Sequence, residues 1–172
     1  MLTTDKNFLK DLGKRCADER RKSKKTQKEV EQVLIQMIPF KLSGCKGSTV
    51  AKWESGENEM THLELLCLCE IYKSDANELL GLSPRKDFLP RQKLDLNIQS
   101  RIGNQISEYR IANHETQAEL ASVLGCKNGA VSKYETGVNG IPVSKFKKIC
   151  DRYRMDAHDL FELPEVHKKA TR

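Results

Sequence analysis

Apolar residues recur at intervals of three and four along most of the chain, and no run of β-branched residues alternates with polar ones. The first spacing puts apolar side chains on one face of an α-helix, whereas strict alternation is typical of a strand. Capping residues and glycines divide the periodic stretches into short helices. We therefore expect an all-α fold. The expected helices cover residues 6–21, 26–38, 46–54, 61–72, 76–81, 96–110, 117–124, 128–135, 142–153 and 157–162.

The clearest helical pattern lies between Thr116 and Gly137. Thr116 and Glu119 have the spacing of a capping box, in which each side chain bonds the other residue's backbone N–H at a helix start. Gly125 tolerates the left-handed conformation that ends a helix. A second short helix with a polar, basic outer face follows, so the pair is typical of a helix-turn-helix. The residues expected on the apolar faces are Ala118, Leu120, Ala121, Val123, Leu124, Ala130, Val131 and Tyr134.

The chain also repeats itself. Residues 26–29 (T-Q-x-E) match 116–119 at an offset of 90, and residues 50–56 (V-x-K-W-E-x-G) match 131–137 (V-x-K-Y-E-x-G) at an offset of 81. Self-similarity of this kind predicts two copies of one unit, here two tandem five-helix domains. The expected divisions are a first domain at 1–82, a proline-containing linker at 83–95, a second domain at 96–163 and a basic tail at 164–172.

The change of offset reflects nine extra residues, Ile35 to Ser43, in the first copy. Pro39 should end the helix near Ile38, because proline cannot continue a helix. Two interpretations stay open: the insert folds back onto its own core, or it presents an apolar patch to another copy or to the second domain. The candidate interface residues are Ile35, Met37, Ile38, Phe40 and Leu42.

Composition and charge narrow the function. With 172 residues, 38% of them apolar, the chain has room for one ordinary domain or two small ones. The net charge of +6 favours a nucleic-acid partner, and the bases concentrate in residues 1–30 whereas acids dominate residues 53–82. No apolar run is long enough to span a membrane and the start lacks a signal-peptide pattern. We therefore expect a cytoplasmic protein whose six cysteines stay reduced.

Taken together, the T-Q-x-E-L-A…L-G…V-S-K-Y-E-x-G pattern of residues 116–137 resembles the lambda-repressor-like helix-turn-helix domains of Cro, CI and Xre-type transcriptional regulators. The resemblance implies double-stranded DNA as the partner. It also implies that the glutamine opening the second helix contacts a phosphate, and that the first residues of the third helix meet base edges. In the second copy these positions are Gln117, Lys127, Asn128, Gly129, Ser132 and Lys133. In the first copy they are Gln27, Lys46, Ser48, Thr49 and Lys52.

The two copies are not expected to read DNA equally. An asparagine amide can pair bidentately with adenine, so Asn128 is the expected base reader. Gly47 stands at the matching position of the first copy, where a basic run at residues 20–25 is placed to contact backbone. We therefore expect the second copy to read sequence and the first copy to contact mainly phosphate.

The resemblance further implies that an arginine ending the first helix pairs with the glutamate of the third helix in a partly buried ion pair. These residues are Arg110 with Glu135, and Arg20 with Glu54. We interpret both pairs as structural.

Cysteine and histidine positions do not indicate a metal site. Cys69 and Cys150 recur at matching places in the helical pattern, which is how cysteines used as small hydrophobes are placed. Cys67 and Cys69 are too close for an ordinary zinc hook. The histidines at 62, 114, 158 and 167 are expected on surfaces. With no phosphate-binding glycine loop, nucleophile elbow or zinc-protease motif, we expect no cofactor, no metal and no enzyme.

The sequence therefore predicts a DNA-binding transcriptional regulator, more specifically a repressor that occupies a promoter, with a homodimer as the expected assembly and no small-molecule ligand. The alternative is a protein-interaction module of the antitoxin or anti-repressor type. In that case the first domain, with its apolar insert, mediates dimerisation or binds a partner.

Overall fold

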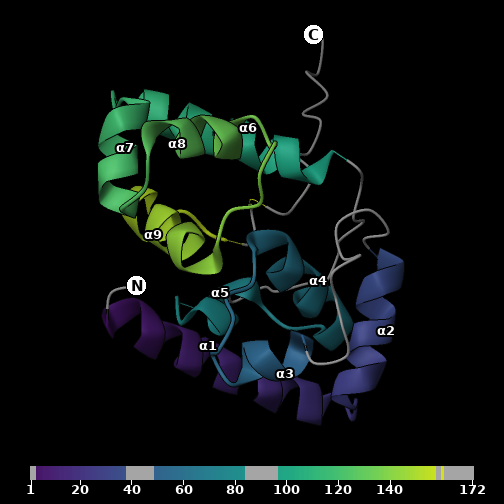
Figure 1. Ribbon diagram of the computed structural model, residues 1–172. Helices are drawn as coiled ribbons and strands as arrows, with labels where there is room; N and C mark the ends of the chain where they lie inside the picture. The colour runs from purple at the N-terminus through teal and green to yellow at the C-terminus, as the bar shows by residue number, and fades with distance from the viewer. Residues whose placement is uncertain (1–2, 38–48, 84–96, 158–159, 161–172) are drawn as a thin grey trace, which may run out of the picture.

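The computed structural model describes residues 3–37, 49–83, 97–157 and 160. Over these residues the chain forms nine α-helices and no strand, which confirms the all-α prediction for that part of the chain (Figure 1). We refer to α1–α5 as the first half and to α6–α9 as the second half. The helices are α1 (Thr3–Lys22), α2 (Gln27–Met37), α3 (Thr49–Glu54), α4 (His62–Tyr72), α5 (Ala76–Leu80), α6 (Ile98–Ala112), α7 (Gln117–Leu124), α8 (Asn128–Glu135) and α9 (Val143–Tyr153).

The predicted helix bounds agree best in the second half. The helices predicted at 117–124 and 128–135 are observed with those bounds, and α9 starts one residue later than predicted. In the first half α1 starts three residues before the predicted position. The linker prediction and the helix predicted at 157–162 fall largely outside the described residues, and so does most of the insert.

Local capping explains where α7 begins and ends. The Thr116 hydroxyl accepts from the Glu119 N–H, and the Glu119 carboxylate accepts from the Thr116 N–H at 2.7 Å, so the predicted capping box is confirmed. These bonds from Thr116 hold the pKa of Glu119 below its ordinary value. Gly125 ends α7 with φ of 61°, a conformation that residues with a Cβ rarely adopt. The turn into α8 is therefore set by residues local to it.

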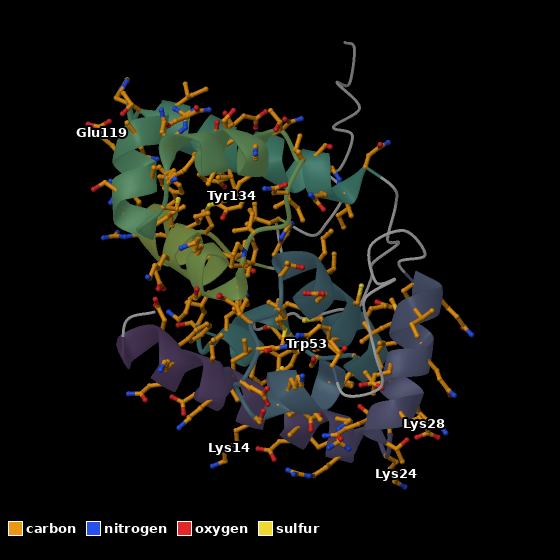
Figure 2. The ribbon with its side chains drawn as sticks, in the orientation of Figure 1. Lys14, Lys24, Lys28, Trp53, Glu119 and Tyr134 are labelled. Atoms are coloured by element: carbon orange, nitrogen blue, oxygen red, sulfur yellow. The ribbon has the colours of Figure 1, made fainter. Side chains whose placement is uncertain are left out.

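Each half buries its own apolar face. In the first half α1 packs against α3, α4 and α5, and in the second α6 and α7 pack against α8 and α9. Figure 2 shows the matching residues Trp53 and Tyr134 directed into the interior of their respective halves. Glycine permits a close crossing in both: a Cβ on Gly103 would lie within 3.0 Å of the Glu135 carbonyl, and one on Gly13 within 3.0 Å of the Glu54 carbonyl.

The predicted apolar face of α7 needs one correction. Leu120, Ala121 and Leu124 are buried, but Ala118 is exposed and Val123 is 41% exposed. At 100° per residue, the two exposed positions lie about 100° or more around the helix from the centre of the buried face. The buried face of α7 is therefore narrower than the set of apolar residues in its sequence indicates.

The two halves contact each other through α9, which packs against both α1 and α4, and their buried residues form one continuous cluster. His62 lies in this contact: it is 0% exposed, its ring packs 5.5 Å from that of Phe146, and its Nδ1 accepts from the Ile141 N–H. The surface position expected for His62 is therefore wrong. The reason is that the start of α4 is covered by the second half, a contact that its own helical pattern does not show.

Candidate nucleic-acid interface

The helix pair α7–α8 positions a polar face that is open to solvent. Val131, Tyr134 and Glu135 turn inward, and Lys127 forms the N-cap of α8. Of the residues predicted to contact DNA, Lys127, Asn128, Gly129 and Lys133 are exposed on α8 or its cap, and Ser132 is partly exposed. The structure therefore brings these five predicted residues together along one helix.

A buried network joins the ends of the second half's helices. Arg110 Nε donates to Glu135 Oε1 at 2.5 Å and its Nη2 donates to Oε2 at 3.1 Å. Gln117 Nε2 donates to Glu135 Oε2 at 2.8 Å, and Arg110 Nη1 donates to the Glu115 carbonyl at 2.6 Å. Burial alone would raise the pKa of Glu135, but the donors from Arg110, Gln117 and Ser107 lower it below its ordinary value. The carboxylate therefore stays ionised and ties α6, α7 and α8 together.

The first half contains a matching network. Arg20 Nε donates to Glu54 Oε1 at 2.6 Å, and Gln27 Nε2 donates to Glu54 Oε2 at 2.7 Å. Both glutamines that were predicted to contact phosphate thus have their amide nitrogens bonded to a glutamate. A phosphate contact by Gln27 or Gln117 stays a prediction; each amide nitrogen carries a second N–H that can donate to a phosphate oxygen.

The remaining predicted residues of the first half are less completely placed. Thr49 begins α3 and is partly exposed. On the same helix, Lys52 Nζ lies 3.9 Å from Glu57 Oε1. Lys46 and Ser48 lie outside the described residues. Figure 2 shows Lys24 and Lys28 at the outer side of this half, beside the start of α2.

The apolar insert is described only at its start. Ile35 is 48% exposed and Met37 packs partly against the core. Ile38, Phe40 and Leu42 lie outside the described residues, so both interpretations of the insert stay open.

Glu115 was missed by the sequence reasoning. This buried residue accepts from Tyr153 Oη at 2.6 Å and from Arg152 Nε at 3.0 Å, which ties the turn before α7 to the end of α9. Lys25 occupies the matching position of the first copy, so the repeat gave no signal for it. The available signal was an acid placed directly before the cap.

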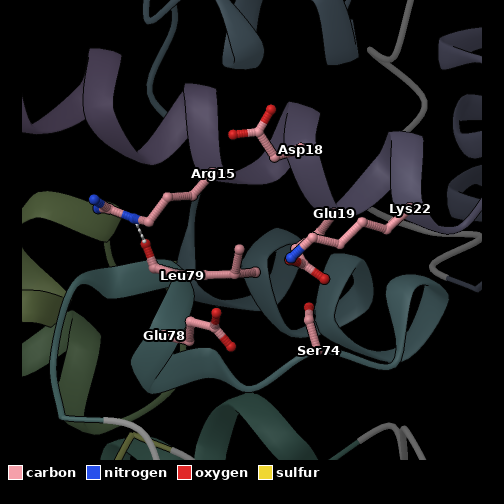
Figure 3. Close-up of a pocket in the computed structure, with 7 residues that line it drawn as sticks. All are labelled: Arg15, Asp18, Glu19, Lys22, Ser74, Glu78 and Leu79. Atoms are coloured by element: carbon pink, nitrogen blue, oxygen red, sulfur yellow. Dashed lines mark hydrogen bonds and ion pairs between the residues drawn. The ribbon is translucent and has the colours of Figure 1, made fainter.

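A small pocket between α1 and α5 does not add a site. Figure 3 shows Arg15 directed at Leu79, whose carbonyl accepts from Arg15 Nε at 2.7 Å. Lys22 Nζ forms an ion pair with Glu19 Oε1 at 2.5 Å. The cavity volume is about 160 Å³, and the lining mixes bases with acids. Such a lining selects neither anions nor cations, and ligand pockets are usually several hundred Å³.

The cysteines of the described residues are unpaired thiols. Burial raises the pKa of Cys16, Cys67 and Cys150 to about 12 in each case, so these thiols stay protonated and inert at neutral pH.

In the described part of the chain, no group of three or more His, Cys, Asp or Glu side chains is placed to hold a metal ion. There too, every helix is too short or too polar to cross a bilayer.

Comparison with known proteins finds a similarity that covers the helix pair. The family model described as helix-turn-helix matches residues 106–160, from the second part of α6 to the turn after α9. No match was found among curated proteins or among solved structures. The second half of this chain is thus similar to the helix-turn-helix family, which supports the resemblance seen in residues 116–137.

Proposed function

We propose that the protein is a sequence-specific DNA-binding transcriptional regulator that represses by occupying a promoter. The observation that carries the proposal is the solvent-facing side of α8, which lies inside the segment similar to helix-turn-helix domains. Its exposed residues are two lysines, an asparagine and a glycine. Lysines neutralise phosphates, and an asparagine amide reads an adenine edge in the major groove.

The roles differ along this surface. Asn128, in the first turn of α8, reads a base, and Lys127 beside it contacts backbone. Lys133 lies on the following turn and contacts a phosphate or a guanine. Gly129 reads nothing, but a Cβ there would meet no atom within 4 Å, so the DNA can approach closely. In the first half Thr49 and Lys52 hold the backbone, with Lys46 and Ser48 assigned from the sequence alone.

A second candidate function is binding of a protein partner by the first half. The observation that favours it is Ile35, a large apolar side chain that is 48% exposed at the start of the insert. A homodimer formed through this region stays a prediction. One exposed isoleucine is common on surfaces, so we place this function second.

A footprint on the DNA upstream of the gene, taken at two salt concentrations, tests the proposal. The wild type is compared with a Lys127→Ala, Asn128→Ala, Lys133→Ala variant whose helicity is checked by circular dichroism. The matched control is Lys6→Ala, Asn7→Ala, Lys10→Ala, which removes the same residue types from the exposed side of α1. Each lost phosphate contact should reduce the slope of log affinity against log salt by about 1.

The expected result is a discrete footprint that weakens with salt, persists in the control and disappears in the α8 variant. No footprint, or one that both variants keep equally, would contradict DNA reading by α8. It would shift the choice to the protein-interaction function.

A further inference from the structure

The contact between the halves pairs residues that match each other in the repeat. Residues 60–62 and 141–143 are 81 positions apart, the offset that relates the third-helix motifs. The His62 N–H donates to the Ile141 carbonyl at 2.9 Å, and the Val143 N–H donates to the Met60 carbonyl at 2.9 Å. Thr61 and Pro142 face each other between these bonds as an isolated antiparallel bridge. The offset of 81 exchanges these two hydrogen bonds with each other and pairs Thr61 with its own counterpart, Pro142, which is what a two-fold axis produces.

The arrangement of the helices follows the same symmetry. Figure 1 shows α1 and α6 along opposite edges of the molecule and running in opposite directions. α2 and α7 lie on opposite sides, and α4 and α9 occupy the middle. α3 lies in front of α1, and α8 lies in front of α6. A two-fold axis directed toward the viewer therefore places α3 and α8 on one face of the molecule.

The contact is buried and specific. Met60, Ile141 and Val143 are each at most 2% exposed. Asn77, itself 3% exposed, donates from Nδ2 to Asp156 Oδ1 at 2.7 Å and accepts at Oδ1 from the Ala157 N–H at 2.9 Å. Both hydrogen-bonding groups of this amide are satisfied by the other half. Such a contact fixes the two halves in one orientation instead of letting them swing.

We infer that one chain is a dimer-like unit that binds, as a monomer, a single duplex site composed of two different half-sites with approximate two-fold symmetry. The inference rests on the proposed function. Duplex DNA has local two-fold axes, so a two-fold protein matches half-sites of opposite orientation. α8 presents Lys127, Asn128 and Lys133 to one half-site, whereas α3 presents Thr49 and Lys52 to the other. The half-sites therefore differ in sequence, and a second copy of the chain is not required.

The first arm of the test is a disulfide between the halves, made with Thr61→Cys and Pro142→Cys. The bonds on either side make this a non-hydrogen-bonded antiparallel pair, whose Cα atoms lie about 4.5 Å apart. That separation is within the range that a disulfide spans. Oxidation should give one intrachain bond between residues 61 and 142, identified by peptide mapping. The two single variants are the controls, and failure of the double variant to form the bond in folded protein would overturn the inference.

The second arm is selection of binding sites from a random duplex pool, with wild type and with the oxidised double variant. Both should select two inverted, non-identical blocks, and light scattering of the complex should give one chain per duplex. Inserting about 5 bp, half a helical turn, between the blocks rotates one half-site to the opposite face. Because the linked second contact is then lost, affinity should fall by about 100-fold or more.

The outcomes separate the inference from the proposed function. A single selected block, two chains per duplex, or affinity indifferent to the insertion would overturn the inference and leave DNA reading intact. Loss of two-block binding in the oxidised variant, with wild type unaffected, would also overturn it. A chain that forms the disulfide and selects no sequence would overturn the proposed function and the inference together.

Discussion

Replacing Gly103 with alanine should destabilise the protein, although alanine is the better helix former. Gly103 lies in α6 where that helix crosses the end of α8. An added Cβ would lie within 3.0 Å of the Tyr134 and Glu135 carbonyl oxygens. A carbon normally meets a carbonyl oxygen at roughly 3.3–3.6 Å, so the two helices must separate. Both opposing atoms belong to backbone, and no side-chain rotation relieves the contact.

The magnitude follows from two opposing effects. Overpacking a well-packed interior costs about 1–3 kcal/mol, and rigid backbone on both sides puts this site at the upper end. Replacing a helical glycine with alanine returns about 1 kcal/mol. We expect a net loss of about 2 kcal/mol in the free energy of unfolding. For a cooperative unit of this size that corresponds to a fall in Tm of about 4–8 °C.

Gly129→Ala is the matched control. Gly129 lies in α8 with no atom within 4 Å of an added Cβ, so the helix gain of about 1 kcal/mol should appear without a clash. Urea unfolding followed at 222 nm measures both variants, and the two substitutions should change the midpoint in opposite directions. If Gly103→Ala were as stable as wild type, the close crossing of α6 and α8 would be refuted. Gly13→Ala, which meets the Glu54 and Trp53 carbonyls, should repeat the loss in the first half.

Three further predictions concern buried charges and thiols. Arg110→Ala leaves the Glu135 carboxylate unpaired in the interior and should cost about 3–5 kcal/mol of unfolding free energy, measured with urea; a loss below about 1 kcal/mol would show a solvated pair. The folded-state pKa of Glu135 lies below its ordinary 4.5, so its stabilisation is complete above that pH and is lost as pH falls below it. Urea midpoints between pH 6 and 3 should therefore fall less steeply in Arg110→Ala, and parallel curves would contradict this. At pH 8 iodoacetamide should alkylate the partly exposed Cys126 in native protein but Cys150 only in urea, because burial raises the pKa of Cys150 to about 12; equal rates in the native protein would contradict this.

The helix-turn-helix pair could be predicted closely because its determinants are local. The capping box of Thr116 and Glu119 and the left-handed turn at Gly125 are set by residues within a few positions of each other. Such signals fix both ends of a short helix without information from the rest of the chain. The exposed face of α8 followed from the same periodicity.

The contact between the halves could not be predicted in this way. His62 was expected on the surface, because periodicity shows burial within one helix and not which other element covers it. The proline-containing stretch at 83–95 indicated a linker between two units, and nothing in it indicated a buried contact between them. Asn77 gave no signal either, since its partners at residues 156 and 157 lie about half the chain away.

The bonding of Gln117 and Arg110 to Glu135 has a consequence for the thermodynamics of the proposed DNA binding. The carboxylate links α6, α7 and α8, so α8, the helix we propose to read DNA, is held in place in the free protein. Side chains already ordered lose little rotamer freedom on binding, and preorganised surfaces keep more of their contact energy as affinity. Association should accordingly proceed with little backbone rearrangement, and its rate should be governed by electrostatic steering. The entropy cost of ordering α8 is therefore met during folding and not during DNA binding.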